Sequence, residues 1–377
     1  MKIPEQLKTY VNLPNELIPV IFITHMEHHS NQTSWLETIA DVVCIAPTDE
    51  GRVDINDLQK QLDIYKDRKL KIGSFSACSN VTGVKTSYHK MAKLMHDSQG
   101  FCFIDFACSA PYSDMNMHPE DPLEKLDAVF FSPHKFLGGP GTPRIIIFDS
   151  KLYYNRVPDN PGGGTVDWTN PWGEHKFINN IELREDGGTP AFFQSIKAAL
   201  CVQLKEKMTV KNIEEREKEL VKTAFEELRK VPKLHILADN IEERLGAISF
   251  YIDNIHYNLI VKLLNDRFGI QVRGGCSCAG TYAHYLLQVS PMQSHKIIEK
   301  INHGDYSEKP GWIRTSLHPT MTNEEIYFIA DALKDIVKNI TTWEKDYKYL
   351  SSPNEYINLL SGEDETESIK NLFMMNG

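Results

Sequence analysis

The sequence lacks the long apolar runs and basic blocks that mark two large classes of protein. No apolar run approaches the roughly 20 residues that a membrane-spanning helix needs, and the first residues, MKIP, do not open a signal peptide. The 41 Lys and Arg residues are outnumbered by 51 Asp and Glu residues, which gives a net charge of −10. The basic residues form no cluster of the kind that binds nucleic acid. We therefore expect neither a membrane nor a nucleic acid among the partners.

The sequence also lacks a disulfide framework, because its seven cysteines are an odd number without regular spacing. Free thiols are typical of a reducing compartment, and we expect a cytoplasmic protein. With 377 residues, of which 41% are hydrophobic and 24% charged, the chain has the length for two domains and the composition of an ordinary globular protein.

Short apolar runs alternate with amphipathic segments through the first half of the chain. We predict strands near residues 20–23, 42–45, 70–76, 101–104, 128–131 and 145–148, with helices around 55–62 and 91–95. Continuous apolar strands separated by helices predict an α/β fold with a mainly parallel sheet covered on both faces. Ligands of such sheets bind at the carboxyl ends of the strands. Asn80, Asp105 and Lys135 fall at such ends.

The second half of the chain has a different pattern. A long loop rich in Gly, Pro and Trp is followed by predicted helices at 192–208, 212–229, 257–268 and 323–337 and strands near 247–252 and 312–317. We predict a large domain over residues 1–208, a smaller α+β domain over 209–342 and a polar tail over 343–377.

Lys135 stands out in the stretch FFSPHKFLGGPGTP, directly after a predicted strand. A single lysine on a turn is most often a solvated surface charge. Here three glycines shortly after it let the backbone approach a bound group, Ser132 and His134 offer donors, and Asp105 ends an apolar strand. A desolvated lysine amine can form a Schiff base, and an aspartate that faces a pyridine nitrogen keeps it protonated. The pattern therefore favours a pyridoxal phosphate site.

The stretches DFACSAP and SPHKFLGGPGTP resemble the fold-type I, class V aminotransferases, particularly their cysteine desulfurase and selenocysteine lyase branch. The resemblance extends over residues 20–338 and implies pyridoxal 5'-phosphate as the cofactor. By this resemblance Lys135 would hold the aldehyde carbon and Asp105 would protonate the ring nitrogen. Ser132 and His134 would contact the phosphate.

Further motifs of the family follow in the expected order. THMEHHSNQTSW resembles the EHHxN segment, in which His28 would stack on the cofactor ring and Asn31 would lie in the substrate site. ACSNVTG would place Asn80 near the cofactor, although an asparagine in an ordinary turn is an alternative. REDGGTP would bring Thr189 to the phosphate of the neighbouring subunit, which implies a homodimer with a composite active site.

A histidine cluster offers a different interpretation of the same segment. His25, His28 and His29 could bind a metal ion, but no H-E-x-x-H helix accompanies them. We therefore expect no metal.

The desulfurase loop has its counterpart in GIQVRGGCSCAG. By resemblance, Cys278 takes the position of the persulfide-forming cysteine, with Arg273 at the family's arginine. GWIRTSLHPTM resembles the final strand, whose arginine, here Arg314, would hold the substrate carboxylate with its planar fork. Two alternatives stay open: the C-x-C pair could be small buried or oxidisable residues, and Arg314 could pair with Glu324 or Glu325.

Two departures from the family pattern bear on function. Where desulfurases have a glutamine on the phenolic oxygen of the cofactor, this sequence has Cys108, a much weaker hydrogen-bonding partner. Only residues 1–19 precede the first predicted strand, and they contain no glycine. The family's earlier segment carries a strand and a phosphate-binding turn at a helix N-terminus. We therefore expect a family member begun late, with weaker phosphate binding and an exposed flank of the sheet.

The resemblance implies an enzyme that releases sulfur from cysteine. Cys278 would attack the substrate sulfur, which leaves a persulfide and alanine, while His28 would assist proton transfer. Cys108 and the additional Cys276 leave open an aminotransferase without sulfur chemistry. The short N-terminus leaves open an inactive subunit that only binds a partner.

Overall fold

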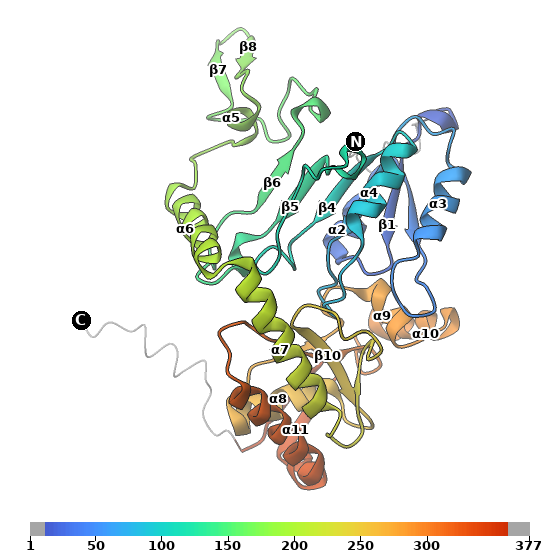
Figure 1. Cartoon of the computed structure of the whole chain (residues 1–377), viewed down its shortest axis with the longest axis vertical. Helices are drawn as coiled ribbons and strands as arrows, with labels where there is room; N and C mark the ends of the chain where they lie inside the picture. Colours follow the sequence, from blue (N-terminus) through green and yellow to red (C-terminus); the bar gives the residue numbers. More distant parts are fainter. Residues whose placement is uncertain (1–11, 361–377) are drawn as a thin grey trace, which may run out of the picture.

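The first half of the chain folds around a six-stranded sheet (Figure 1), and the computed structural model describes residues 12–360. Its strands are β1 (Val20–Thr24), β2 (Asp41–Ile45), β3 (Lys71–Ser76), β4 (Phe101–Asp105), β5 (Ala128–Phe131) and β6 (Ile145–Phe148). In the order β2-β1-β3-β4-β5-β6 all neighbours are parallel except β5 and β6, which are antiparallel. The predicted α/β class with a mainly parallel sheet is confirmed.

Helices cover both faces of the sheet at its β1–β3 side. They are α2 (His29–Leu36), α3 (Ile55–Ile64) and α4 (Tyr88–Asp97). Leu58 of α3 and Met95 of α4 join the buried cluster around Phe22. Trp35 of α2 packs against Ile21 on the opposite face, because successive strand residues point to opposite sides.

Strand β6 has no such cover within residues 12–360. Ile146 and Ile147 are 62% and 48% exposed although they point to opposite faces of the strand. The sheet therefore presents an apolar edge strand.

The second lobe is built on a four-stranded antiparallel sheet in the order β11-β12-β10-β9. Its strands are β9 (Leu234–Ile236), β10 (Ala247–Ile252), β11 (Arg273–Gly275) and β12 (Trp312–Ser316). Helices α7 (Val210–Leu228), α8 (Tyr257–Phe268) and α11 (Asn323–Trp343) contribute to its apolar core. Thr209, with a φ of 61°, turns the chain between α7 and the preceding α6 (Phe192–Met208) at the predicted domain boundary.

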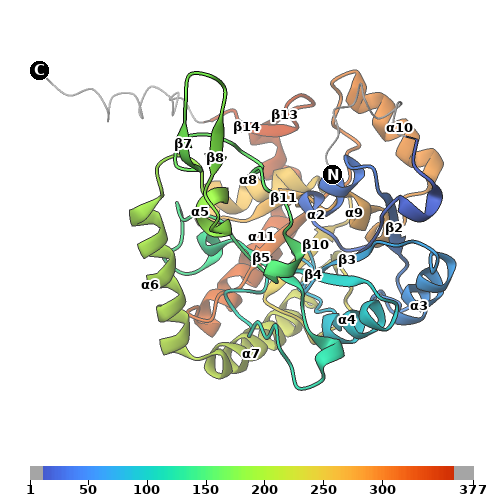
Figure 2. The same cartoon turned by 90° about the horizontal axis from the view of Figure 1, so that it is seen from above.

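Several elements were not expected from the sequence. The long Gly- and Pro-rich loop contains β7 (Val166–Thr169), β8 (His175–Phe177) and α5 (Ile181–Glu185), and the loop after β11 is followed by α9 (Gly280–Leu286) and α10 (Pro291–Asn302). The β7–β8 hairpin projects from the molecule, and α6 lies along one edge of the molecule (Figures 1 and 2). Short 3₁₀ turns are η1 (Asn15–Leu17), η2 (Pro122–Glu124), η3 (Pro133–Lys135), η4 (Ser150–Leu152) and η5 (Glu344–Asp346).

Part of the predicted polar tail is folded. Strands β13 (Tyr347–Leu350) and β14 (Glu355–Asn358) form a hairpin that packs against α8. Residues 361–377 of the predicted tail, like residues 1–11 of the glycine-free N-terminal segment, lie outside the described residues.

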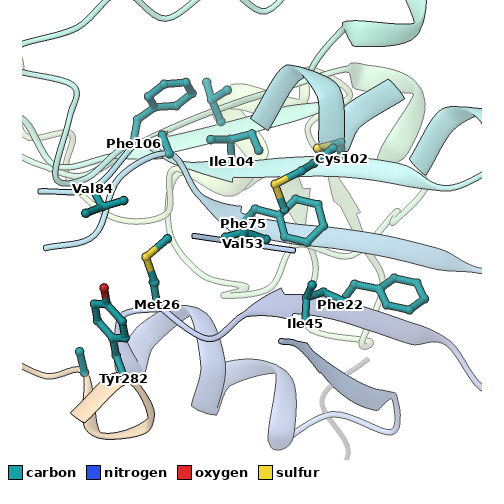
Figure 3. Packing of buried hydrophobic residues seen from close by; sticks show 14 of the residues in the cluster. Phe22, Met26, Ile45, Val53, Phe75, Val84, Cys102, Ile104, Phe106 and Tyr282 are labelled. Carbon is teal, nitrogen blue, oxygen red and sulfur yellow. The ribbon is translucent and has the colours of Figure 1, made fainter. Parts of the chain in front are cut away.

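The core of the first lobe also anchors a loop from far along the chain. Figure 3 shows Tyr282 of α9 beside Met26, in the cluster that contains Phe75 and Phe106. Burying an aromatic side chain of this size contributes about 1.5–3 kcal/mol. Because Ala279 and Tyr282 are buried in this core, the loop just before them, residues 276–278, is held against the first lobe.

Candidate functional site

The carboxyl ends of the parallel strands open into a cavity of about 440 Å³. The predicted site residues that line it are His28, Asn31, Asn80, Asp105, Cys108, Ser132, His134 and Lys135. They come from the segments that follow β1, β3, β4 and β5, as expected for a parallel sheet. Arg144, Ile145 and Ile146 at the start of the edge strand β6 also line it, as do Ser30, Ser76, Cys78, Ala107, Phe130 and Phe131.

Lys135 is presented to this cavity by a tight turn. It ends the 3₁₀ turn η3, and Gly138 follows with a φ of +77°. A Cβ atom on Gly139 would lie 2.0 Å from the carbonyl oxygen of Pro133, so this position excludes any side chain. The glycines in the motif thus close the turn that carries the lysine.

Asp105 lies at the end of β4 and is only 8% exposed. Burial raises the pKa of its carboxyl group from 3.8 to about 6, against the lowering effects of the Ala107 N–H and of Lys135. The Ala107 amide donates to Asp105 Oδ1 at 2.8 Å. A positive charge placed in the cavity beside this carboxylate would compensate for its burial.

His28 caps the N-terminus of α2 by accepting a hydrogen bond from the Ser30 amide at Nδ1, 3.1 Å away. Burial is the largest cause that lowers its pKa from 6.5 to about 4, and the nearby positive charges of Lys135, Arg273 and Arg314 contribute to the same shift. The imidazole is therefore neutral at physiological pH and free to accept a proton.

Glu27 is a buried carboxyl group that the sequence analysis did not single out. Its Oε1 accepts hydrogen bonds from Thr24 Oγ1 at 2.6 Å and from the Ser76 amide at 3.0 Å. Its Oε2 accepts from Asn31 Nδ2 at 2.7 Å and from Ser76 Oγ at 2.6 Å. Glu27 thus ties the turn that carries His28 to the end of β3. Its place directly before His28 in the EHHxN segment was the available signal.

Cys108 has a thiol neighbour in the same cavity. The Cys78 and Cys108 Sγ atoms are 4.0 Å apart, and Cys78 donates to Cys108. This hydrogen bond lowers the pKa of Cys108, and the charges of Lys135 and Arg314 act in the same direction against burial. Of the two thiols, Cys108 is therefore the more easily ionised, because burial raises the pKa of Cys78.

Arg314 on β12 lines neither cavity, but it contacts Asn80, which lines the first. Its Nη1 donates to the Asn80 carbonyl oxygen at 2.9 Å, and Asn80 Nδ2 donates to the Ser277 carbonyl oxygen at 2.7 Å. The alternative partner Glu325 is engaged in the capping box of α11 instead, where it accepts from the Thr322 amide at 2.7 Å.

Cys278 and Arg273 line a second cavity of about 650 Å³ that shares no lining residue with the first. Arg273 Nη2 donates to Cys278 Sγ at 3.2 Å, and the Cys278 carbonyl oxygen accepts from the His29 amide at 2.7 Å. His29 lines the second cavity, whereas its neighbour His28 lines the first. The loop at 276–278 therefore stands between the cavities, and the structure does not place the Cys278 side chain in the same cavity as Lys135.

Thr189 is exposed and lines neither cavity of its own chain. It lies in the turn that precedes α6, at the exposed edge of the first lobe.

The histidine cluster does not form a metal site. Within residues 12–360 no group of three or more His, Cys, Asp or Glu side chains is placed to hold a metal ion. His25 is buried and packs edge-on against the rings of Tyr282 and Tyr285. No helix in the same range is both long and apolar enough to cross a membrane.

The chain is similar in sequence to proteins described as cysteine desulfurases. "Probable cysteine desulfurase 2" of Mycobacterium leprae is 28% identical over 265 residues, which are 69% of this chain and 60% of that protein. "Probable cysteine desulfurase" of Pyrococcus abyssi is 26% identical over 336 residues, 85% of this chain and 73% of that protein. The chain spans about three fifths of the length of the first of these relatives.

Solved structures of similar fold include cysteine desulfurase CsdA from Escherichia coli, with a TM-score of 0.70, 21% identity, and coverage of 86% of this chain and 73% of that one. The apo structure of the cysteine desulfurase from Thermococcus onnurineus NA1 has a TM-score of 0.69 at 24% identity and covers 88% of this chain and 75% of that one. The pattern that defines the family Aminotransferase class-V matches residues 19–328. The family predicted from the motifs is thereby confirmed, and the chain belongs to the class-V aminotransferases.

Proposed function

We propose that this chain carries a pyridoxal phosphate-dependent cysteine desulfurase activity. The observation that carries the proposal is the first cavity, in which Lys135, Asp105 and His28 meet at the strand ends next to a cysteine-bearing loop. The named relatives support the same chemistry, although the chain spans only part of their length.

The residues present fit the cofactor. The cavity of about 440 Å³ is within the usual range for small ligands. The Lys135 amine and the buried Asp105 carboxyl group both line it. Asn80 Oδ1 also has no hydrogen-bonding partner among the described residues. When bound, pyridoxal phosphate would supply an aldehyde for a lysine amine and an electron sink for the substrate. Lys135 would hold the aldehyde carbon, Asp105 would pair with the ring nitrogen, and Ser132 and His134 would contact the phosphate.

The remaining side chains of the site have complementary roles. The neutral His28 would stack on the ring and accept a proton from the substrate. Arg314 would hold the substrate carboxylate, with Asn31 and Arg273 beside the substrate and Asn80 near the cofactor. Cys108 would face the phenolic oxygen in place of glutamine. Thr189 would reach the phosphate of the neighbouring subunit.

Cys278 would act as the nucleophile toward the substrate sulfur. Its thiolate attacks that sulfur, the carbon–sulfur bond breaks, and the electron pair stays with the substrate carbon, which is later protonated to give alanine. Arg273 already donates to Cys278 Sγ and stabilises negative charge there. Attack in the first cavity requires the Cys278 side chain to turn toward it.

We further propose a homodimer with a composite site in the cytoplasm. Four large apolar side chains on one side of α6 are exposed: Phe192, Phe193, Ile196 and Leu200. They form an apolar surface of the kind that partners cover, and Ile146 on the edge strand β6 is exposed as well. The seven cysteines are free thiols, which supports a reducing compartment.

The test is the conversion of cysteine by protein loaded with pyridoxal phosphate, measured as both alanine and sulfide. Lys135→Ala should abolish both products and the visible absorbance of the bound cofactor. Cys278→Ala should abolish sulfide release while the absorbance remains. Unchanged sulfide release in Cys278→Ala would rule out the desulfurase mechanism.

A second candidate function is an aminotransferase without sulfur chemistry, because the Cys278 side chain lines the other cavity in this structure. Keto-acid formation from amino acids without sulfur would favour it. An inactive binding subunit would bind no cofactor at Lys135, so its absorbance would be the same with and without the Lys135→Ala substitution.

A further inference from the structure

The second cavity contains two thiols rather than one. Cys276 and Cys278 are separated by one residue and both line it. Both are half-buried, whereas Ser277 between them is 2% exposed. Both cysteines are therefore partly open to the cavity, although Cys276 also packs against the apolar core of the first lobe.

The backbone of the loop determines which side chains face the cavity. Ser277 and Cys278 have φ angles of 53° and 59°, and Gly275 has a φ of 98°. Non-glycine residues adopt this left-handed region only when the surroundings hold them there. The bonds from Asn80 to the Ser277 carbonyl and from His29 to the Cys278 carbonyl provide that hold.

The cavity is predominantly cationic. Its charged lining residues are Lys262, Arg273 and Lys309 with the single carboxylate Glu355, and His29 lies beside them. Thiolates and persulfide anions are stabilised by such positive charges. The cavity volume of about 650 Å³ leaves room for a small thiol beside the two cysteines.

The outer wall of the cavity comes from the β13–β14 hairpin, beyond residues 19–328 that match the family. Asn258 Nδ2 donates to the Asn354 carbonyl at 2.6 Å, and Asn354 Nδ2 donates to the Tyr257 hydroxyl at 2.8 Å. This segment of the chain thus encloses the two thiols on the side away from Lys135.

We propose that Cys276 is a second sulfur-carrying residue, which receives sulfur from Cys278 inside the second cavity and passes it to a thiol acceptor that enters there. The proposal rests on the proposed desulfurase function, in which Cys278 first becomes a persulfide. It extends that function by assigning the two steps to different cavities. Sulfur is removed from the substrate in the first cavity and leaves the protein from the second.

The transfer step needs no oxidant or reductant. The Cys276 thiolate attacks the outer sulfur of the Cys278 persulfide. A new bond forms between that sulfur and Cys276 Sγ, the bond to Cys278 Sγ breaks, and Cys278 leaves as a thiolate that takes the proton lost by Cys276. Their Cα atoms, two residues apart, lie within about 7 Å.

The experiment locates sulfur on each cysteine. Protein loaded with pyridoxal phosphate is given cysteine without oxygen, alkylated, digested and analysed by tandem mass spectrometry. The variants are Cys276→Ser and Cys278→Ser, with Cys44→Ser as a control at a cysteine that lines neither cavity. We expect added sulfur on both loop cysteines in the wild type and the control, complete loss from Cys276 in Cys278→Ser, and retention on Cys278 in Cys276→Ser.

A second arm separates this proposal from the desulfurase function. Protein without cofactor is treated with glutathione persulfide, which can deliver sulfur directly to the second cavity. Sulfur on Cys276 in this arm supports the proposal even if cysteine gives no persulfide in the first arm, in which case the desulfurase function alone fails. Sulfur on Cys278 with none on Cys276 in both arms overturns the proposal, as does the absence of sulfur from both cysteines in the second arm.

Discussion

Replacing Asp105 by asparagine should stabilise the cofactor-free protein while weakening its binding of pyridoxal phosphate. The carboxyl group is 8% exposed, and its pKa is raised from 3.8 to about 6 chiefly by burial. The folded state therefore binds more protons than the unfolded state between these two values, and stability falls as the pH rises through that range. An amide has no charge to bury and avoids this loss.

The size of the effect follows from the same values. A rise from 3.8 to about 6 corresponds to about 3 kcal/mol of lost stability once the carboxyl group is fully ionised. Near pH 4 the wild type and Asp105→Asn should differ little from this cause, and above about pH 7 the variant should gain up to about 3 kcal/mol.

Chemical denaturation of cofactor-free protein at several pH values measures this difference. Asp127→Asn, directly before the neighbouring strand β5, is a matched control: burial opposes ionisation there too, but hydrogen bonds from His96 and the Cys102 amide, at 2.8 Å each, lower its pKa. Its replacement should therefore reduce stability at neutral pH. If Asp105→Asn were no more stable than the wild type above pH 7, or if its advantage did not grow with pH, the account of a desolvated carboxylate would be wrong. Titration with pyridoxal phosphate should show weaker binding by the same variant.

Three other predictions concern the turn, the histidine and the apolar surface. Gly139→Ala should reduce cofactor binding, measured by absorbance, because its Cβ atom would lie 2.0 Å from the Pro133 carbonyl oxygen. The control Gly163→Ala has open space around its Cβ atom and should bind the cofactor normally. Equal binding by the two variants would refute the role of the turn. The His28 pKa measured by NMR should be about 4. Because the unfolded state then binds a proton more readily than the folded state, stability should fall as the pH drops from 6.5 to about 4. A measured pKa near 6.5 would contradict the burial of His28. The Phe193 side chain on α6 is 84% exposed, and Phe193→Glu should shift a dimer toward monomer in light scattering. The control Tyr327→Glu on α11 should leave the dimer intact. A dimer unchanged by Phe193→Glu would exclude the apolar surface of α6 as the interface.

The sheet and its site edge were predictable because their signals are strong and local. Apolar runs such as 145–148 predict strands, Asp105 directly follows the run at 101–104, and Lys135 lies four residues after the run at 128–131. Since parallel strands bring their carboxyl ends to one edge, residues 30 positions apart in the sequence were correctly expected to share a cavity.

The missed elements have weak sequence signals. Helix α2 is polar, with only Asn31 buried, so it has no apolar stripe to recognise. The β13–β14 hairpin is short and half-exposed, and its position is fixed by side-chain hydrogen bonds such as that from Asn354 to Tyr257.

The orientation of Cys278 could not be read from sequence at all. Whether its side chain faces Lys135 or the second cavity depends on two left-handed residues held by His29 and Asn80. Contacts so distant along the chain leave no local pattern.

The most direct test of the proposed activity is the mass of the Cys278-containing peptide after the protein, loaded with pyridoxal phosphate, has been given cysteine. We predict the gain of one sulfur atom on the 276–278 loop in the wild type, alanine in solution, and neither in Lys135→Ala. Alanine formation with no sulfur on that loop, or equal products from Lys135→Ala, would contradict the proposed mechanism.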